Sequence, residues 1–135
     1  MQMIDYISIV DDDPITIFGI KKLLDLTVTV KKIDTHVNGR LALDAILGKM
    51  ENNEPLPQII FLDLNMPIMD GWDFLEEFIK LPIAHKVRIN IVTSSIDAYD
   101  INQWHHYRSR THHLITFNNK PLTRINLEAI AKIAS

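Results

Sequence analysis

The chain of 135 residues contains no cysteine and no long apolar run. The absence of cysteine excludes disulfide bonds, thiolate metal sites and a cysteine nucleophile, and it fits a reducing compartment. No apolar segment approaches the roughly 20 residues that a membrane-spanning helix requires, and the N-terminus lacks the basic segment and apolar core of a signal peptide. The net charge of −3 provides no basic field for nucleic acid. We therefore expect a cytoplasmic protein that binds neither nucleic acid nor membrane directly.

The composition is that of an ordinary globular domain. Hydrophobic residues make up 47% of the chain and charged residues 23%. The length suffices to bury a core within one domain, and we find no internal repeat, linker or low-complexity tract. We therefore expect residues 1–135 to form a single domain.

The segment 59–67, with the sequence IIFLDLNMP, is the most informative part of the chain. Residues 59–62 are apolar without alternation, which predicts a strand buried on both faces, as in a parallel sheet. Asp63 follows directly and would lie at the carboxyl end of that strand, where open α/β sheets bind ligands. Taken alone, an aspartate there is better explained by a turn or a helix cap than by a functional role, since aspartate commonly starts turns.

Strand and helix patterns alternate along the rest of the chain, which predicts a parallel sheet covered by helices on both faces. We expect the polar pair Lys31-Lys32 to break the second strand, and Ile125 to belong to the apolar face of the last helix. The expected strands are 4–10, 28–37, 59–62, 87–92 and 114–117. The expected helices are 14–25, 41–50, 72–79, 98–108 and 122–134. We expect turns at Asn38-Gly39 and Asp70-Gly71, and helix caps at Asp70 and Asp97. Leu41 should lie on the core face of the second helix, and Trp72 should anchor the third.

Polar residues follow several of these strands. The run Asp11-Asp12-Asp13 follows the first, Asp63 the third and Thr93 the fourth, and the loop after the fifth contains Lys120. Asp13 is explained as the cap of a helix that begins at a proline, but the two aspartates before it are not. Carboxylates brought together repel one another unless a cation neutralises them, and an all-oxygen cluster suits Mg²⁺. The sequence therefore predicts a Mg²⁺ site at this edge of the sheet.

Charge suggests a role for each group in such a site. A carboxylate can act as a nucleophile toward phosphorus and form an aspartyl phosphate. Asp63 is the natural nucleophile because it lies on the middle strand. The Lys120 ammonium would offset charge on the phosphoryl oxygens, and the Thr93 hydroxyl could donate a hydrogen bond to one of them.

Four motifs in order resemble those of response-regulator receiver domains, the phospho-acceptor modules of two-component signalling, over essentially the whole chain. They are VDDDP at 10–14, LDLNMPIMDG at 62–71, IVTS at 91–94 and NKP at 119–121. The resemblance implies a flavodoxin-like (βα)5 fold with strand order 2-1-3-4-5.

The resemblance also implies roles for individual residues. Asp63 would accept the phosphoryl group from the phosphohistidine of a histidine kinase, and Thr93 and Lys120 would contact that group. The peptide bond between Lys120 and Pro121 would be cis. The implied metal ligands, for Mg²⁺ or in its place Mn²⁺, are Asp11, Asp12, Asp63 and the backbone carbonyl of Asn65.

By the same resemblance, Phe117 would be the aromatic residue that turns inward when Thr93 moves, and Asn65 and Ser95 would tune the phosphoryl lifetime. The signal would pass to the surface of the fourth helix, fifth strand and fifth helix. The implied partners are a histidine kinase or histidine phosphotransfer protein, a downstream protein and, through that surface, a second copy. No output domain follows the last helix, so we expect a stand-alone receiver.

The segment 97–113 departs from the family pattern by its length and its four histidines. The adjacent histidine pairs do not have the spacing that places two ligands on one helical face. We expect a partly exposed surface segment that reshapes the output surface, with histidine-dependent pH sensitivity as the alternative.

Two other functions remain open from the sequence. Haloacid-dehalogenase-like phosphohydrolases have a chemically similar site, but their motif carries a second aspartate where this chain has Asn65. A receiver fold that signals without phosphate is the other possibility, and the intact set of acidic residues, Thr93 and Lys120 argues against it.

Overall fold

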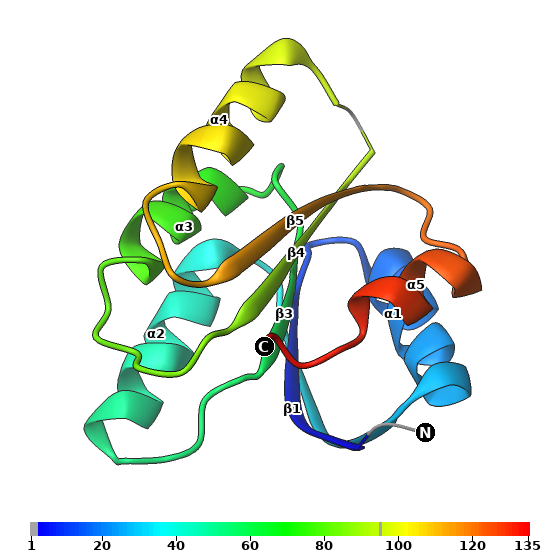
Figure 1. The fold of residues 1–135 in the computed structure, drawn as a ribbon, viewed down its shortest axis with the longest axis horizontal. Helices are drawn as coiled ribbons and strands as arrows, with labels where there is room; N and C mark the ends of the chain where they lie inside the picture. The colour runs from blue at the N-terminus through cyan, green and yellow to red at the C-terminus, as the bar shows by residue number, and fades with distance from the viewer. Residues whose placement is uncertain (1–2, 95) are drawn as a thin grey trace.

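The computed structural model describes residues 3–94 and 96–135, in which five parallel strands form one open sheet with helices on both faces (Figure 1). The strand order β2-β1-β3-β4-β5 confirms the predicted flavodoxin-like fold. The strands are β1 (Met3–Val10), β2 (Thr29–His36), β3 (Ile59–Leu62), β4 (Arg88–Thr93) and β5 (Leu114–Asn119). The helices are α1 (Pro14–Thr27), α2 (Gly39–Glu51), α3 (Gly71–Phe78), α4 (Ala98–Arg108) and α5 (Arg124–Ile130).

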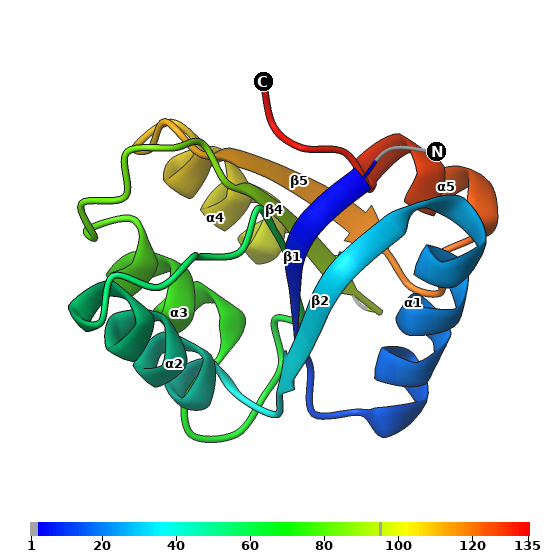
Figure 2. The same ribbon diagram turned by 90° about the horizontal axis from the view of Figure 1, so that it is seen from below.

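The sheet separates two hydrophobic cores. Helices α1 and α5 cover one face, and α2, α3 and α4 cover the other (Figure 2). All four residues of β3 are buried, as predicted for a central parallel strand. Alternate residues of β3 therefore serve the two cores, with Ile59 and Phe61 on the α1 side and Ile60 and Leu62 on the other.

Each helix begins at a polar residue whose side chain accepts a hydrogen bond from a backbone amide of the first turn. The predicted caps Asp13, Asp70 and Asp97 are confirmed. Asn38, which the sequence places in a turn, caps α2. Leu41, expected in the core, is 47% exposed, because Ala42, Leu43 and Ile46 form the buried face of α2.

The expected break in the second strand is wrong. Strand β2 is continuous from Thr29 to His36 and pairs with β1 on both sides of Lys31. The two lysines at 31 and 32 are exposed there. An edge strand tolerates such charges because its outer side remains solvated.

The last helix is shorter than predicted. Helix α5 begins after Thr123, which forms a capping box with Asn126, and it ends at Ile130. Ile125 is 79% exposed and does not belong to the core. Side chains on or near β4 hold the end of this helix and the residues after it. The Asn90 side chain donates to the carbonyl of Ile130, the last helical residue. Arg88 and Lys86 likewise donate to the carbonyls of Lys132 and Ser135.

The segment from α4 to β5 is less exposed than expected. Tyr107 and His113 are buried, and the indole N–H of Trp104 donates to the carbonyl of Ile115 at 2.9 Å. Trp72, predicted to anchor α3, is buried and stacks on the Tyr107 ring at 5.8 Å. The aromatic residues therefore attach α4 to the core, and the interpretation as a bland surface segment is wrong for these positions.

Among the helices in the two described ranges, none combines the length and apolar character needed to cross a membrane.

Candidate functional site

The strand register brings the predicted acidic residues together. Val10 pairs with Leu62, so the next residues, Asp11 and Asp63, emerge side by side at the carboxyl edge of the sheet. The Asp63 N–H donates to the Val10 carbonyl at 2.9 Å and fixes this alignment. Together with Asp12, they offer carboxylate oxygens that all lie within 4.8 Å of one another.

The two inner carboxylates are poorly solvated. Asp11 is 2% exposed and Asp63 is 6% exposed, whereas Asp12 is exposed. Burial, followed by the charge of Asp11, raises the pKa of Asp63 to about 6. Burial likewise raises the pKa of Asp11. Negative charge is therefore concentrated where a cation would stabilise it.

Lys120 provides one such positive charge. Its Nζ lies 3.0 Å from Asp11 Oδ2 and 3.4 Å from Asp63 Oδ1. Burial opposes the ammonium charge, but the two carboxylates outweigh burial and raise the pKa of Lys120. The Lys120 N–H donates to the Thr93 carbonyl at 2.8 Å, and the peptide bond to Pro121 is cis, as predicted.

Backbone amides orient the two carboxylates. The Leu64 N–H donates to Asp63 Oδ1, and the Asp13 N–H donates to Asp11 Oδ1, each at 2.9 Å. These hydrogen bonds favour the ionised forms and limit side-chain rotation. The site is thus held by the turns that follow β1 and β3.

Gly71 supports this arrangement in a way that the sequence interpretation missed. A Cβ atom at this position would lie 2.5 Å from the backbone oxygen of Asp63. The Gly71 N–H also donates to the Leu64 carbonyl at 2.9 Å and closes the loop after β3. The signal was a glycine eight residues after Asp63, interpreted only as a turn and helix start.

The remaining predicted residues lie around this cluster. Thr93 is fully buried at the end of β4. Asn65 is exposed in the loop after β3. The Phe117 ring on β5 lies 6.5 Å from the Trp72 ring and 5.7 Å from the Trp104 ring. Ser95 lies outside the described residues.

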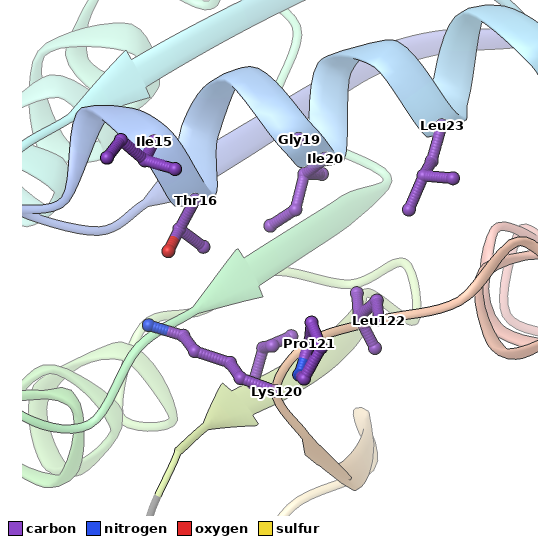
Figure 3. Close-up of a pocket in the computed structure, with 9 residues that line it drawn as sticks. Ile15, Thr16, Gly19, Ile20, Leu23, Lys120, Pro121 and Leu122 are labelled. Atoms are coloured by element: carbon purple, nitrogen blue, oxygen red, sulfur yellow. The ribbon is translucent and has the colours of Figure 1, made fainter.

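An apolar groove adjoins the acidic cluster. It has a volume of about 260 Å³ and lies between α1 and the segment from Lys120 to Leu122 (Figure 3). Ile15, which lines the groove on the first turn of α1, is 79% exposed; Phe18, on the same helix but outside the groove lining, is 66% exposed. The Lys120 side chain lines the groove and also reaches Asp11 and Asp63, so the groove and the cluster share one residue.

The residues present fit a divalent metal ion. The cluster offers only oxygen ligands, two of its three members are buried, and the described ranges contain no other acidic or histidine group of this kind. This set suits a hard cation such as Mg²⁺ or Mn²⁺.

The family model of the response regulator receiver domain matches residues 7–130. This match covers most of the chain and favours the receiver resemblance over the phosphohydrolase alternative.

Solved structures share the fold. A two-component response regulator from Cytophaga hutchinsonii has a TM-score of 0.78 and 24% identity, over 96% of this chain and 95% of that one. The Mn²⁺-bound form of response regulator Rcp1 has a TM-score of 0.70 and 22% identity, over 93% of this chain and 88% of that one. The CheX–CheY–BeF₃–Mg²⁺ complex of Borrelia burgdorferi has a TM-score of 0.73 and 21% identity, over 93% of this chain and 85% of that one.

Curated relatives match only part of their own length. A protein-glutamate methylesterase/protein-glutamine glutaminase of Treponema denticola is 40% identical over 82 residues, 58% of this chain and 20% of that protein. An uncharacterised response regulatory protein of Vibrio cholerae is 28% identical over 118 residues, 87% of this chain and 40% of that protein. The chain therefore spans about a fifth of the length of the first relative and about two fifths of the length of the second.

Proposed function

The chain belongs to the response regulator receiver domain family, a signalling domain and not a metabolic enzyme, and on that premise we propose that it is a switch phosphorylated at Asp63. The phosphoryl donor would be the phosphohistidine of a histidine kinase or a histidine phosphotransfer protein. The observation that carries this proposal is the buried Asp63 carboxylate, placed within reach of both a second carboxylate and the Lys120 ammonium.

The transfer needs little more than positioning and charge. A carboxylate oxygen of Asp63 attacks phosphorus, a P–O bond forms and the P–N bond to the donor imidazole breaks. The electron pair of that bond stays on the imidazole nitrogen, which takes a proton from water. Lys120 lies close enough to offset charge on the phosphoryl oxygens.

Asp11, Asp12, Asp63 and the Asn65 carbonyl would hold Mg²⁺, or Mn²⁺ in its place, and the ion would neutralise part of the phosphoryl charge. The Mn²⁺-bound form of Rcp1 supports this assignment by analogy of fold. The buried, closely spaced carboxylates support it directly.

A donor protein would dock on the groove beside α1. The groove shares Lys120 with the acidic cluster, so a partner seated there lies next to Asp63. The exposed apolar side chains of Ile15 and Phe18 would gain a covered environment in the complex.

The output would pass through α4, β5 and α5 to a downstream protein or a second copy. Thr93 adjoins Lys120 at the sheet edge, and the Phe117 ring contacts the indole rings of Trp72 on α3 and Trp104 on α4. A shift at Thr93 could therefore reach α4 through the aromatic contacts of Phe117. The CheX–CheY complex is an example of a fold neighbour bound to another protein. Action without an attached output domain and a cytoplasmic location stay predictions.

The proposal is tested by the intact mass of the protein after incubation with acetyl phosphate, with and without Mg²⁺. We expect a Mg²⁺-dependent adduct of one phosphoryl group on the wild type and none on Asp63→Asn. Asp44→Asn, which changes an exposed aspartate on α2, is the matched control and should be labelled like the wild type. A chain that takes no label, or an Asp63→Asn variant labelled as the wild type is, would contradict the proposal.

A further inference from the structure

Two lysine side chains meet over one buried tyrosine ring, outside the acidic cluster. Lys32 on the edge strand β2 is the cross-strand partner of Tyr6 on β1, and its Nζ lies 4.6 Å from the centre of the tyrosine ring. Lys49 reaches the same ring from the last turn of α2, with its Nζ 5.4 Å from the centre. The ring attracts each cation, but this arrangement also brings two like charges together.

The two amino groups are hydrogen-bond partners, which requires one of them to be neutral. An ammonium group has three donors and no acceptor, so only an uncharged amine can accept a hydrogen bond from another lysine. The hydrogen bond with Lys49, partial loss of hydration and the charge of Lys49 lower the pKa of Lys32. The same hydrogen bond is the largest cause that raises the pKa of Lys49.

The surrounding charges make Lys49 the ammonium and Lys32 the acceptor. Lys49 Nζ lies 3.4 Å from Glu54 Oε2, its side chain is 17% exposed, and the last turn of a helix favours a cation. Asp34 and Glu54 also act on Lys32 and would raise its pKa, but the effect of Lys49 is larger. Lys32 is exposed, so a small molecule can reach its amine.

We propose that Lys32 is a site of acylation by small acyl phosphates. Its neutral Nζ attacks the carbonyl carbon of the acyl phosphate, and a C–N bond forms. The C–O bond to phosphate breaks, its electron pair leaves with inorganic phosphate, and the nitrogen loses a proton to water. The amide carbonyl of the product can accept the hydrogen bond of Lys49, so acylation removes one of two like charges and keeps a partner for the other.

Acetyl phosphate would therefore modify this chain at two places and through two different atoms. Asp63 would attack its phosphorus, whereas Lys32 would attack its carbonyl carbon. The inference does not depend on the proposed function, because Lys32 and Lys49 take no part in phosphoryl transfer.

The test is site-resolved mass spectrometry of the whole chain after incubation with acetyl phosphate at pH 7.5. Fragment ions that separate residues 31 and 32 give the acetylation rate of each lysine. Lys31 is the internal reference, because it is the sequence neighbour, is exposed and lies 3.4 Å from Asp5. We expect Lys32 to be acetylated about fivefold faster than Lys31 in the folded chain. The two rates should become equal in concentrated urea, where the lysine pair is separated.

A matched pair of variants tests the role of the second amine. Lys49→Gln removes the charged donor and should make the rates of Lys32 and Lys31 nearly equal in the folded chain. Lys22→Gln is the control, since Lys22 lies over the Phe18 ring on α1 at 5.9 Å, and its rate ratio should match that of the wild type.

The pH dependence of the wild type gives a readout that needs no variant. The rate ratio should fall as the pH rises toward 10.5, because an ordinary lysine is then half neutral as well. Equal rates at Lys32 and Lys31 at pH 7.5, or a ratio that persists in urea or in Lys49→Gln, would overturn the inference and leave the proposed function intact. Acetylation of Lys32 in a chain that takes no phosphoryl group would overturn the proposed function alone.

Discussion

Two aspartates on either side of β1 in the sheet, one on β2 and one directly after β3, show opposite electrostatics. Asp63, after β3, faces another carboxylate, and its pKa is raised to about 6. Asp34, on β2, faces hydrogen-bond donors, and its pKa is lowered to about 2. Both side chains are largely removed from water, so the neighbours and not burial alone decide the difference.

The environment of Asp34 is fully complementary to a negative charge. The hydroxyls of Tyr6 and Ser8 on β1 donate to its two oxygens, and His36 Nε2 lies 3.4 Å from Oδ1. Burial opposes the charge of Asp34, but these hydrogen bonds outweigh it and lower the pKa. Its stabilising effect is therefore complete above its ordinary pKa of 3.8 and is lost as the pH falls through about 2.

The comparison separates structural from functional carboxylates. Asp34 ties the edge strand β2 to β1, and its charge is already compensated. Asp63 and Asp11 share one lysine, so part of their negative charge is not compensated. This negative charge favours the binding of a cation, and of a phosphoryl group that binds together with a cation. The following predictions test this difference, from the largest expected effect to the smallest.

Asp34→Ala should lower the free energy of unfolding by about 3 kcal/mol, because the hydroxyls of Tyr6 and Ser8 would lose their acceptor in a buried place. Urea unfolding at pH 7 measures this loss. Labelling of Asp63 by acetyl phosphate should remain within about twofold of wild type. A loss below about 1 kcal/mol, or a loss of labelling, would show that Asp34 is not a purely structural carboxylate.

His113 extends the comparison to a base. Its Nδ1 accepts the Val87 N–H at 2.9 Å, its Nε2 has no hydrogen-bond partner among the described residues, and burial lowers its pKa to about 4. The folded state therefore resists protonation: stability is full above pH 6.5 and declines as the pH falls toward 4, by about 2 kcal/mol at pH 5.

Urea unfolding between pH 7.5 and pH 5 tests this prediction. His113→Gln keeps an acceptor for the Val87 N–H but does not titrate, so its stability should vary less with pH. His105→Gln, at an exposed position on α4, should retain the wild-type dependence. Equal pH dependence in the wild type and His113→Gln would contradict the assignment.

Asp11→Asn should raise the free energy of unfolding, whereas Asp34→Ala should lower it. In the absence of metal it removes repulsion from Asp63 and should raise the free energy of unfolding by about 1 kcal/mol. Added Mg²⁺ should raise the Tm of the wild type, because the ion binds the folded state, and should raise that of the variant much less. Thermal melts in EDTA and in MgCl₂ give both values, and a variant less stable than wild type in EDTA would refute the repulsion.

Asp44→Asn should have the smallest effect. Asp44 pairs with Arg40 at 3.3 Å on the solvent-exposed side of α2, one turn apart. Such a pair is screened by water, so urea unfolding should show a change below about 0.5 kcal/mol. A larger change would mean that surface charge contributes to the differences assigned to burial.

The sequence by itself determined the order of elements and the main members of the site. An unbroken apolar run predicts the central strand at 59–62 and places Asp63 at its end, because a buried parallel strand must be apolar on both faces. Aspartates before helical segments predict caps for the same local reason, since a cap involves only neighbouring residues. The receiver resemblance then supplied the strand order, which strand pairing confirms.

Tertiary structure alone decided the charge states. Asp34 and Asp63 are the same residue type, and the groups around each side chain, most of them from other strands, give the two carboxyls opposite pKa shifts. The burial of His113 likewise depends on packing against elements far along the chain. These properties cannot be predicted from the sequence because they arise from groups that folding brings together. Strand and helix patterns can be predicted because they depend on consecutive residues.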